Sequence, residues 1–126
     1  MNNDYLKEQL SKFSENTTIK DLQKYINDMV EIRGFKDTPQ DIMLLLTEEI
    51  GELAKEIRKS RKYFLDTSKN NELDVEGEIA DVFIYILSMC RVMNVNLIEA
   101  FKNKEERNCK REWKYLEEKW VNILKI

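Results

Sequence analysis

The chain has 126 residues, enough to bury one hydrophobic core but short for two domains. Charged residues make up 36% of it, the net charge is only −3, and Gly and Pro are scarce, at three and one. Scarce helix breakers combined with abundant Leu, Ile, Glu and Lys favour an all-α fold. The small net charge, without a basic stripe carrying aromatic residues, argues against a nucleic-acid polymer as partner.

Three further features indicate the compartment in which the protein works. Cys90 and Cys109 lie in helical patterns without CxxC spacing, which predicts two buried free thiols. The N-terminus lacks the charged and then apolar layout of a signal peptide. The longest apolar run, 79–93, is shorter than the roughly 20 residues that span a bilayer, and it contains Asp81 and Arg91. We therefore expect a soluble cytoplasmic protein with no membrane partner.

The first half of the chain predicts two long helices. Residues 4–13 form either a short leading helix or an arm, and the sequence leaves both open. Thr18 begins a capping-box-like start, and apolar residues then recur at helical spacing as far as Gly34, which ends the helix. Thr38 followed by Pro39 starts the next helix, which we expect to run to about residue 62.

The second half predicts two more helices. The polar stretch 66–71 reads as the main loop, and a third core helix is expected over 73–93. Asn96 caps a fourth helix that continues towards the C-terminus. Short connections between long helices predict an antiparallel four-helix bundle in one domain. Its parts are a leading segment 1–17, a core 18–112 and a C-terminal helical extension 113–126.

Acidic residues on the helix that starts at Thr38 are not confined to a solvated face. With each residue turned 100° from the last, Glu49 falls inside the apolar arc and Glu52 lies just beyond its edge. A carboxylate directed at a core is costly unless its charge is compensated. Glu48 lies further out, and we interpret Glu48 and Glu56 as ordinary solvent-facing or rim residues.

The third helix carries a second acidic pair in an apolar setting. This helix is apolar round most of its circumference, which predicts that part of it faces another subunit. Glu78 and Asp81 share a narrow strip with Tyr85, and they can face Glu49 and Glu52 on the neighbouring helix. Four ionised carboxylates brought together repel one another, so we expect them to hold a metal or to be partly protonated. Acids at this spacing also arise by chance in a chain with 24 of them.

The donor atoms narrow the choice of metal. All the candidate ligands are oxygens, and the chain contains no histidine, which disfavours zinc and the di-iron bundles. Mg²⁺ fits best, because it is usually held by a few carboxylates, waters and substrate phosphates. Mn²⁺ is the expected substitute.

These motifs resemble those of the MazG-like all-α nucleoside triphosphate pyrophosphohydrolases. EEIGE at 48–52 and EIAD at 78–81 are similar to their EExxE…ExxD signature. RGF at 33–35, GELAKEIRK at 51–59 and a K-x-x-x-N-x-x-R pattern at 104–111 extend the likeness. The resemblance covers roughly 18–111.

The resemblance implies a four-helix core, a homodimer or homotetramer, and Mg²⁺-dependent cleavage of a nucleoside triphosphate between its α and β phosphates. Its metal ligands would be Glu49, Glu52, Glu78 and Asp81. Glu49 is thereby also a candidate for catalysis, together with Glu48, which would orient or deprotonate the attacking water or only tune its neighbours.

Basic residues would bind the substrate in a protein of this kind. Lys104 and Arg111 would contact phosphates, and Asn108 would bond a phosphate, the sugar or the base. Lys55 and Arg58 are weaker candidates for the phosphates, since basic residues on a helix are usually solvated or paired with Glu.

Two other functions remain open at this stage. A non-catalytic helical bundle that binds a partner or regulates it would keep acidic pairs without turnover. A pyrophosphohydrolase of a biosynthetic nucleotide, such as phosphoribosyl-ATP, is the alternative within the family. Analogy favours a house-cleaning role in the nucleotide pool.

Overall fold

Five helices make up the fold in the computed structural model, which describes residues 1–61, 66–69 and 72–114. No strand occurs in these ranges, so the all-α prediction is confirmed for them. The helices are α1 (Asn3–Ser11), α2 (Ile19–Arg33), α3 (Pro39–Ser60), α4 (Val75–Val92) and α5 (Leu97–Asn108).

Local sequence signals explain where the main helices begin and end. Thr18 and Thr38 each accept a hydrogen bond from the backbone N–H three residues on, and the aspartate there bonds back, so both form capping boxes. Pro39 occupies the first turn of α3, where its missing N–H costs nothing. Gly34 ends α2 in the left-handed conformation, with φ of 69°.

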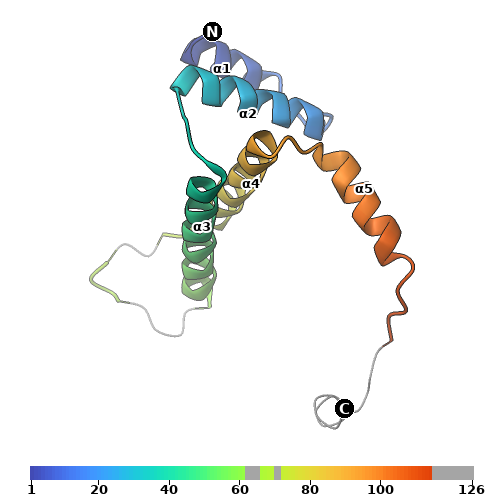
Figure 1. Ribbon diagram of the computed structural model, residues 1–126. Coiled ribbons are helices and arrows are strands. Elements are labelled where there is room, and N and C mark those ends of the chain that lie inside the picture. The colour runs from blue at the N-terminus through green and yellow to red at the C-terminus, as the bar shows by residue number, and fades with distance from the viewer. Residues whose placement is uncertain (62–65, 70–71, 115–126) are drawn as a thin grey trace.

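The helices form an arch (Figure 1). α3 and α4 pack side by side as an antiparallel pair, and this is the most extensive helix contact among the described residues. α2 crosses the end of this pair and carries α1 on its other side. α5 follows α4 closely in sequence, packs against α2, and points away from α3. These are the four core helices and the leading helix that the sequence predicted, but within one chain they form an arch rather than a closed antiparallel bundle, because α5 points away from α3.

The buried core lies where α2 meets α1 and α4. Its buried members are Leu6, Ile26, Met29, Val30 and Leu87. The N-terminal segment is therefore a helix and not an arm, and it joins the core through Leu6.

A polar network adds to the attachment of α1. The Tyr5 hydroxyl donates to Asp28 over 2.9 Å, and the Lys24 ammonium bonds Asp28 at 2.9 Å and Tyr5 at 3.2 Å. The hydrogen bond from Lys24 is the main cause that lowers the pKa of Asp28.

Two sequence predictions about the C-terminal part are wrong. α5 ends at Asn108, and residues 109–114 are not helical, although we expected the helix to continue. The last backbone bonds tighten to three-residue turns, in which Arg111 N–H donates to Asn108. No Gly or Pro marks this end, and the rest of the expected extension lies outside the described residues. Cys90 is buried as predicted, but Cys109 is exposed because it caps α5, which buries no residue.

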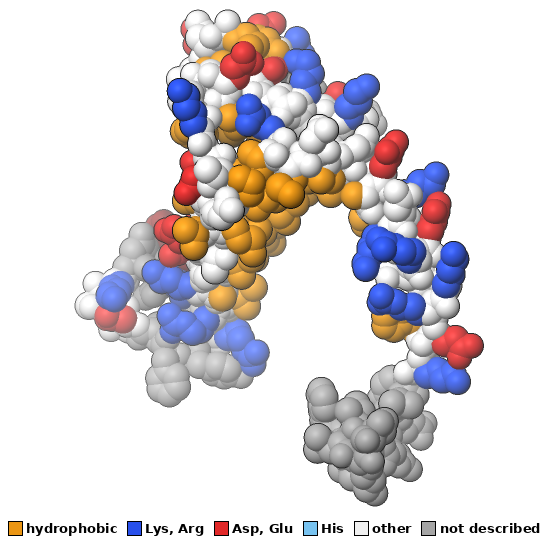
Figure 2. Space-filling model, viewed as in Figure 1, with side chains coloured by type: hydrophobic (Ala, Val, Ile, Leu, Met, Phe, Trp, Pro, Cys, Tyr) orange, Lys and Arg blue, Asp and Glu red, His pale blue; other side chains and the backbone are white. Residues whose placement is uncertain are grey.

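Large apolar side chains lie exposed along the inner side of the arch. Figure 2 shows hydrophobic side chains gathered below α2 and along the α3–α4 pair, while Lys and Arg cover much of the visible face of α5. The exposed apolar residues include Leu44, Ile50, Ile79, Ile98 and Phe101, each at least half exposed. Among the described residues no single helix is long and apolar enough to cross a membrane; only α4 with α5, bent by 99°, passes such a test as a pair.

Candidate metal centre and adjoining pocket

Three carboxylates meet where α3 and α4 pack together. One oxygen each from Glu49, Glu78 and Asp81 lie within 4.8 Å of one another. Glu49 comes from the middle of α3, whereas Glu78 and Asp81 come from successive turns of α4. The antiparallel pairing therefore brings together three of the four ligands that the sequence predicted.

Glu78 is the acid whose pKa this crowding affects most clearly. Its Oε2 atom is buried and has no hydrogen-bond partner among the described residues. Burial raises the pKa of Glu78, and so do the hydrogen bond and charge of Glu49 and the charges of Asp81 and Glu52. An acidic side chain held in this way favours either a proton or a cation beside it.

The remaining two predicted acids lie at the edge of the cluster. Glu52 is exposed and outside the group of three, yet its charge acts on Glu78. Glu48 is also exposed, and its charge helps to raise the pKa of Tyr85. Both side chains are long and solvated, so they remain candidates for the cluster's outer edge.

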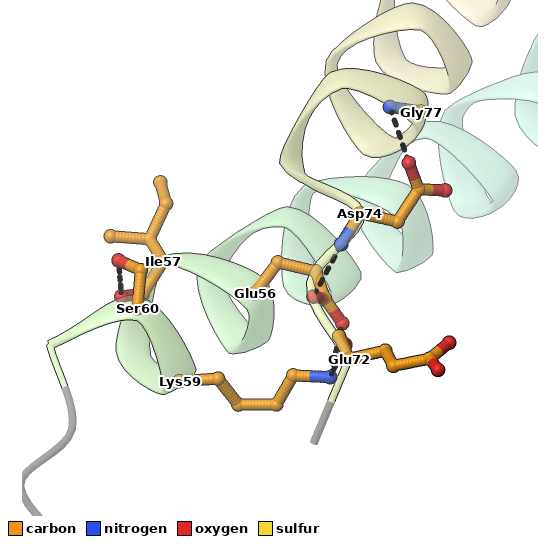
Figure 3. A network of polar contacts seen from close by, with 7 residues as sticks. All are labelled: Glu56, Ile57, Lys59, Ser60, Glu72, Asp74 and Gly77. Atoms are coloured by element: carbon orange, nitrogen blue, oxygen red, sulfur yellow. Dashed lines mark hydrogen bonds and ion pairs between the residues drawn. The ribbon is translucent and has the colours of Figure 1, made fainter. Parts of the chain in front are cut away.

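A sixth acid, Glu56, fixes how α4 begins (Figure 3). Its Oε2 accepts the backbone N–H of Asp74 over 3.0 Å, and its other oxygen pairs with the Lys59 ammonium at 2.8 Å. Lys59 in turn donates to the carbonyl of Glu72 over 3.0 Å. The hydrogen bond from Lys59, followed by that from Asp74, lowers the pKa of Glu56. This residue is buried, so the interpretation of Glu56 as a solvent or rim residue is wrong.

A clasp, formed by Glu56 and Lys59 on the segment 72–74, is followed by the N-cap of α4, where the Asp74 side chain lies close to Gly77. The Asp74 carboxylate accepts the N–H of Gly77 over 3.0 Å, and a Cβ built on Gly77 would collide with that carboxylate. Clasp and cap together set the start of α4 at Val75, three residues before Glu78. They therefore set the register that turns Glu78 and Asp81 towards Glu49.

A pocket of about 450 Å³ opens from the acidic cluster. It lies between α2, α3 and α4, and Glu49 and Asp81 form part of its wall. Its size falls within the range of small-molecule sites, which are mostly apolar with a few polar groups. Its other lining residues include Tyr25, Met29, Arg33, Phe35, Asp37, Tyr85, Ser88 and Arg91.

Tyr85 joins the pocket to the acids. Its side chain is half-buried, and burial is the first cause that raises the pKa of its hydroxyl. The charges of Glu49, Asp81 and Asp37 raise it further. The hydroxyl therefore stays protonated and able to donate a hydrogen bond.

The predicted substrate-binding residues do not gather at this site within one chain. Lys104 and Asn108 lie on α5, Arg111 follows its end, and α5 packs mainly on α2 rather than on α3. Asn108 is half-buried and donates to Glu105 over 3.0 Å, while its Oδ1 has no partner among the described residues. Lys55 and Arg58 are exposed on α3, beyond Glu52 and away from the pocket.

Sequence reasoning missed several residues of the pocket wall. Asp37 stands in a loop, and Arg33 and Arg91 each lie in the last turn of a helix, where a cation is commonplace. Helical periodicity does not show that three such ends meet around one cavity. The pairing of Glu56 with Lys59, at i and i+3, was the one available signal for the clasp.

Comparison with known proteins settles the family. A family model described as the MazG nucleotide pyrophosphohydrolase domain matches residues 37–113, more than half of the chain. The chain belongs to the MazG nucleotide pyrophosphohydrolase family. The match includes every acidic and basic residue that the sequence motifs singled out for the site, from Glu48 to Arg111, and confirms the resemblance.

One relative matches this chain both in sequence and in structure. The uncharacterised protein YpjD of Bacillus subtilis is 34% identical over 88 residues, which cover 66% of this chain and 76% of YpjD. A crystal structure of YpjD from the same organism, where it is described as a proposed pyrophosphatase, matches with a TM-score of 0.66 at 25% identity. That match covers 79% of this chain and all of the YpjD chain. The helical architecture is therefore shared with the solved structure of YpjD.

Proposed function

We propose that this protein is a Mg²⁺-dependent nucleoside triphosphate pyrophosphohydrolase that yields a nucleoside monophosphate and pyrophosphate. The observation that carries the proposal is the buried, unpartnered oxygen of Glu78 amid two further carboxylates, at the end of a nucleoside-sized pocket. Membership of the MazG family supports the reaction class. A house-cleaning role in the cytoplasmic nucleotide pool is part of the proposal.

The residues present fit a divalent cation. The donor set is all oxygen, the carboxylates lie within 4.8 Å of one another, and repulsion and burial raise the pKa of Glu78. Glu49, Glu78 and Asp81 would hold the ion, with Glu52 joining from its exposed position. When bound, Mg²⁺ would neutralise phosphate oxygens and lower the pKa of a bound water. Mn²⁺ suits the same ligands.

The chain's own groups then have distinct tasks. Water adds to the α phosphorus while the bond from that phosphorus to the bridging oxygen breaks, and pyrophosphate leaves with the electron pair. Glu49, or Glu48 acting from the edge, takes the proton that the water loses. The Tyr85 hydroxyl, kept protonated, donates to an oxygen of the sugar or phosphate. Apolar side chains such as Met29 and Phe35 exclude water from the nucleoside.

Cations for the leaving pyrophosphate come, in this proposal, from a second copy of the chain. Lys104, Asn108 and Arg111 lie on or after α5, away from the acids of their own chain. The exposed apolar face of the arch includes Ile98 and Phe101 and would be covered by assembly. A homodimer, alone or paired into a homotetramer, would bring α5 to the acids of the partner. Lys55 and Arg58 would extend the basic rim.

The test is to incubate the protein with ribo- and deoxyribonucleoside triphosphates, with and without Mg²⁺, and to follow products by phosphorus NMR. We expect monophosphate and pyrophosphate only with the metal. Glu49→Gln should abolish turnover and keep the helical circular dichroism, whereas Glu76→Gln, an exposed acid on α4 outside the cluster, should behave like the wild type. Diphosphate and free phosphate as products would refute the proposed cleavage.

The second candidate is a partner-binding helical bundle without turnover. It is favoured by one observation, the exposed apolar face of the arch. This alternative predicts no nucleotide hydrolysis and no response of thermal stability to Mg²⁺. A biosynthetic nucleotide as substrate is tested by adding phosphoribosyl-ATP to the same panel.

A further inference from the structure

Three charged side chains surround the pocket away from its acidic end. Arg33 ends α2, Asp37 precedes α3, and Arg91 lies in the last turn of α4, and all three line the pocket. None of these side chains forms a hydrogen bond or ion pair with another residue in the described ranges. Two guanidinium groups and a carboxylate are therefore available to whatever occupies the pocket.

The separation of Arg91 from the acidic residue Asp81 is suited to the length of a nucleotide. Arg91 follows Asp81 by ten residues of continuous helix, which is roughly 15 Å along the α4 axis. Tyr85 and Ser88 lie between them and line the same pocket. With the phosphates held at Asp81, the ring of the nucleobase would reach towards Arg91. Asp37 is close enough to this path for its charge to act on the Tyr85 hydroxyl.

Asp37 decides which part of a nucleotide these groups suit. Two arginines alone would fit a phosphate, but the carboxylate of Asp37, which lines the same pocket, repels one. An uncharged ring that offers both a hydrogen-bond acceptor and an adjacent donor satisfies Arg91 and Asp37 together. Guanine, hypoxanthine, uracil and thymine have this edge, a carbonyl next to a ring N–H. Adenine and cytosine present an amino group next to a bare ring nitrogen, so each group would meet its like.

We propose that Arg91 and Asp37 make the pocket selective for nucleobases that carry a carbonyl beside a ring N–H. Arg91 donates to the carbonyl, Asp37 accepts from the N–H, and Arg33 supplies a second donor at the same end. This selectivity rests on the proposed function, because it assumes that the phosphates occupy the acidic end.

Two matched substrate pairs isolate this edge. ITP and UTP carry the carbonyl beside a ring N–H. ATP and CTP are their counterparts with an amino group beside a bare ring nitrogen, and the two members of each pair differ in nothing else. We expect kcat/KM to favour ITP over ATP and UTP over CTP by about tenfold or more, the scale of a hydrogen-bonded pair that discriminates bases. Equal values within both pairs would overturn the inference.

Variants assign the preference to the two residues. Arg91→Met and Asp37→Asn should each bring the ratios within both pairs towards one, and Asp37→Asn should do so by improving ATP and CTP, since its amide can donate to a bare ring nitrogen. Lys36→Met and Glu31→Gln are exposed neighbours outside the pocket and serve as controls. Ratios unchanged in both pocket variants would overturn the inference.

Equilibrium binding of IMP and AMP separates this inference from the proposed function. A protein that binds IMP about tenfold more tightly than AMP, and loses this ratio in Arg91→Met, has the selective edge whether or not it hydrolyses triphosphates. Hydrolysis of all four triphosphates with no base preference would uphold the proposed function and refute the selectivity. Neither hydrolysis nor a binding ratio would refute both.

Discussion

Mg²⁺ should stabilise this protein against heat, because the three clustered carboxylates hold a cation only when α3 and α4 are paired. An ion that binds only the native state at a hundred times its Kd adds about 2.7 kcal/mol to the free energy of unfolding. For a chain of this length, each kcal/mol raises Tm by roughly 4 °C. Saturating Mg²⁺ should therefore raise Tm by roughly 10 °C above its value in EDTA.

Glu78→Gln should have opposite effects with and without the metal. The variant loses a ligand, so its Tm should no longer respond to Mg²⁺. In EDTA at neutral pH it should be more stable than the wild type, because it removes one of three crowded negative charges. Glu76→Gln removes an exposed charge from the same helix and is the matched control.

The pH dependence in EDTA has a definite sign. The pKa of Glu78 is raised in the folded protein above its ordinary value of 4.5. Glu78 therefore contributes stability below 4.5 that is lost as the pH rises through its raised pKa. The advantage of Glu78→Gln in EDTA should appear at neutral pH and vanish below 4.5. Differential scanning calorimetry measures all of these quantities, and equal Mg²⁺ responses of wild type and Glu78→Gln would refute the reasoning.

Three structural substitutions have separate readouts. Glu56→Ala should speed hydrogen exchange at the backbone N–H of Asp74, and it should lower turnover by disturbing the register of α4. Lys59→Ala should have a smaller effect on both. Unchanged exchange in Glu56→Ala would contradict the clasp. Thr38→Ala should cost about 1 kcal/mol of stability in urea unfolding, and Thr38→Ser little, because serine restores the cap. Ile26→Ala should cost about 2–5 kcal/mol and Ile26→Val about 1, since this side chain is only 2% exposed; equal losses would argue against tight packing there.

Helix starts were the most predictable part of the fold. Thr18 and Thr38 carry their capping signals within four residues of sequence, so local chemistry alone places α2 and α3. The end of α5 at Asn108 was not predictable, because no glycine or proline follows it. Periodicity does not predict that Ile50 on α3 is half exposed, because that exposure depends on which other helices cover α3, and α5 packs on α2 instead.

The acidic cluster was predictable for a different reason. Glu49, Glu78 and Asp81 stand out because they interrupt apolar helix faces, and an unexplained charge in such a place is visible in one dimension. Asp37 and Arg91 do not interrupt an apolar helix face, because charged residues are ordinary in loops and in the last turns of helices. Their importance appears only when three helix ends meet around a cavity.

The helicity of α5 should depend on the concentration of the protein. It has 12 residues and buries none of them, and isolated helices of that length are marginal in water. On the proposed assembly, most of what holds α5 helical is supplied by another molecule. Dilution should then unwind α5 before it disturbs α3 or α4, so helicity measured by circular dichroism at nanomolar protein should fall short of that at micromolar protein. The protein's abundance in its cell would thus set how much of it has a complete active site.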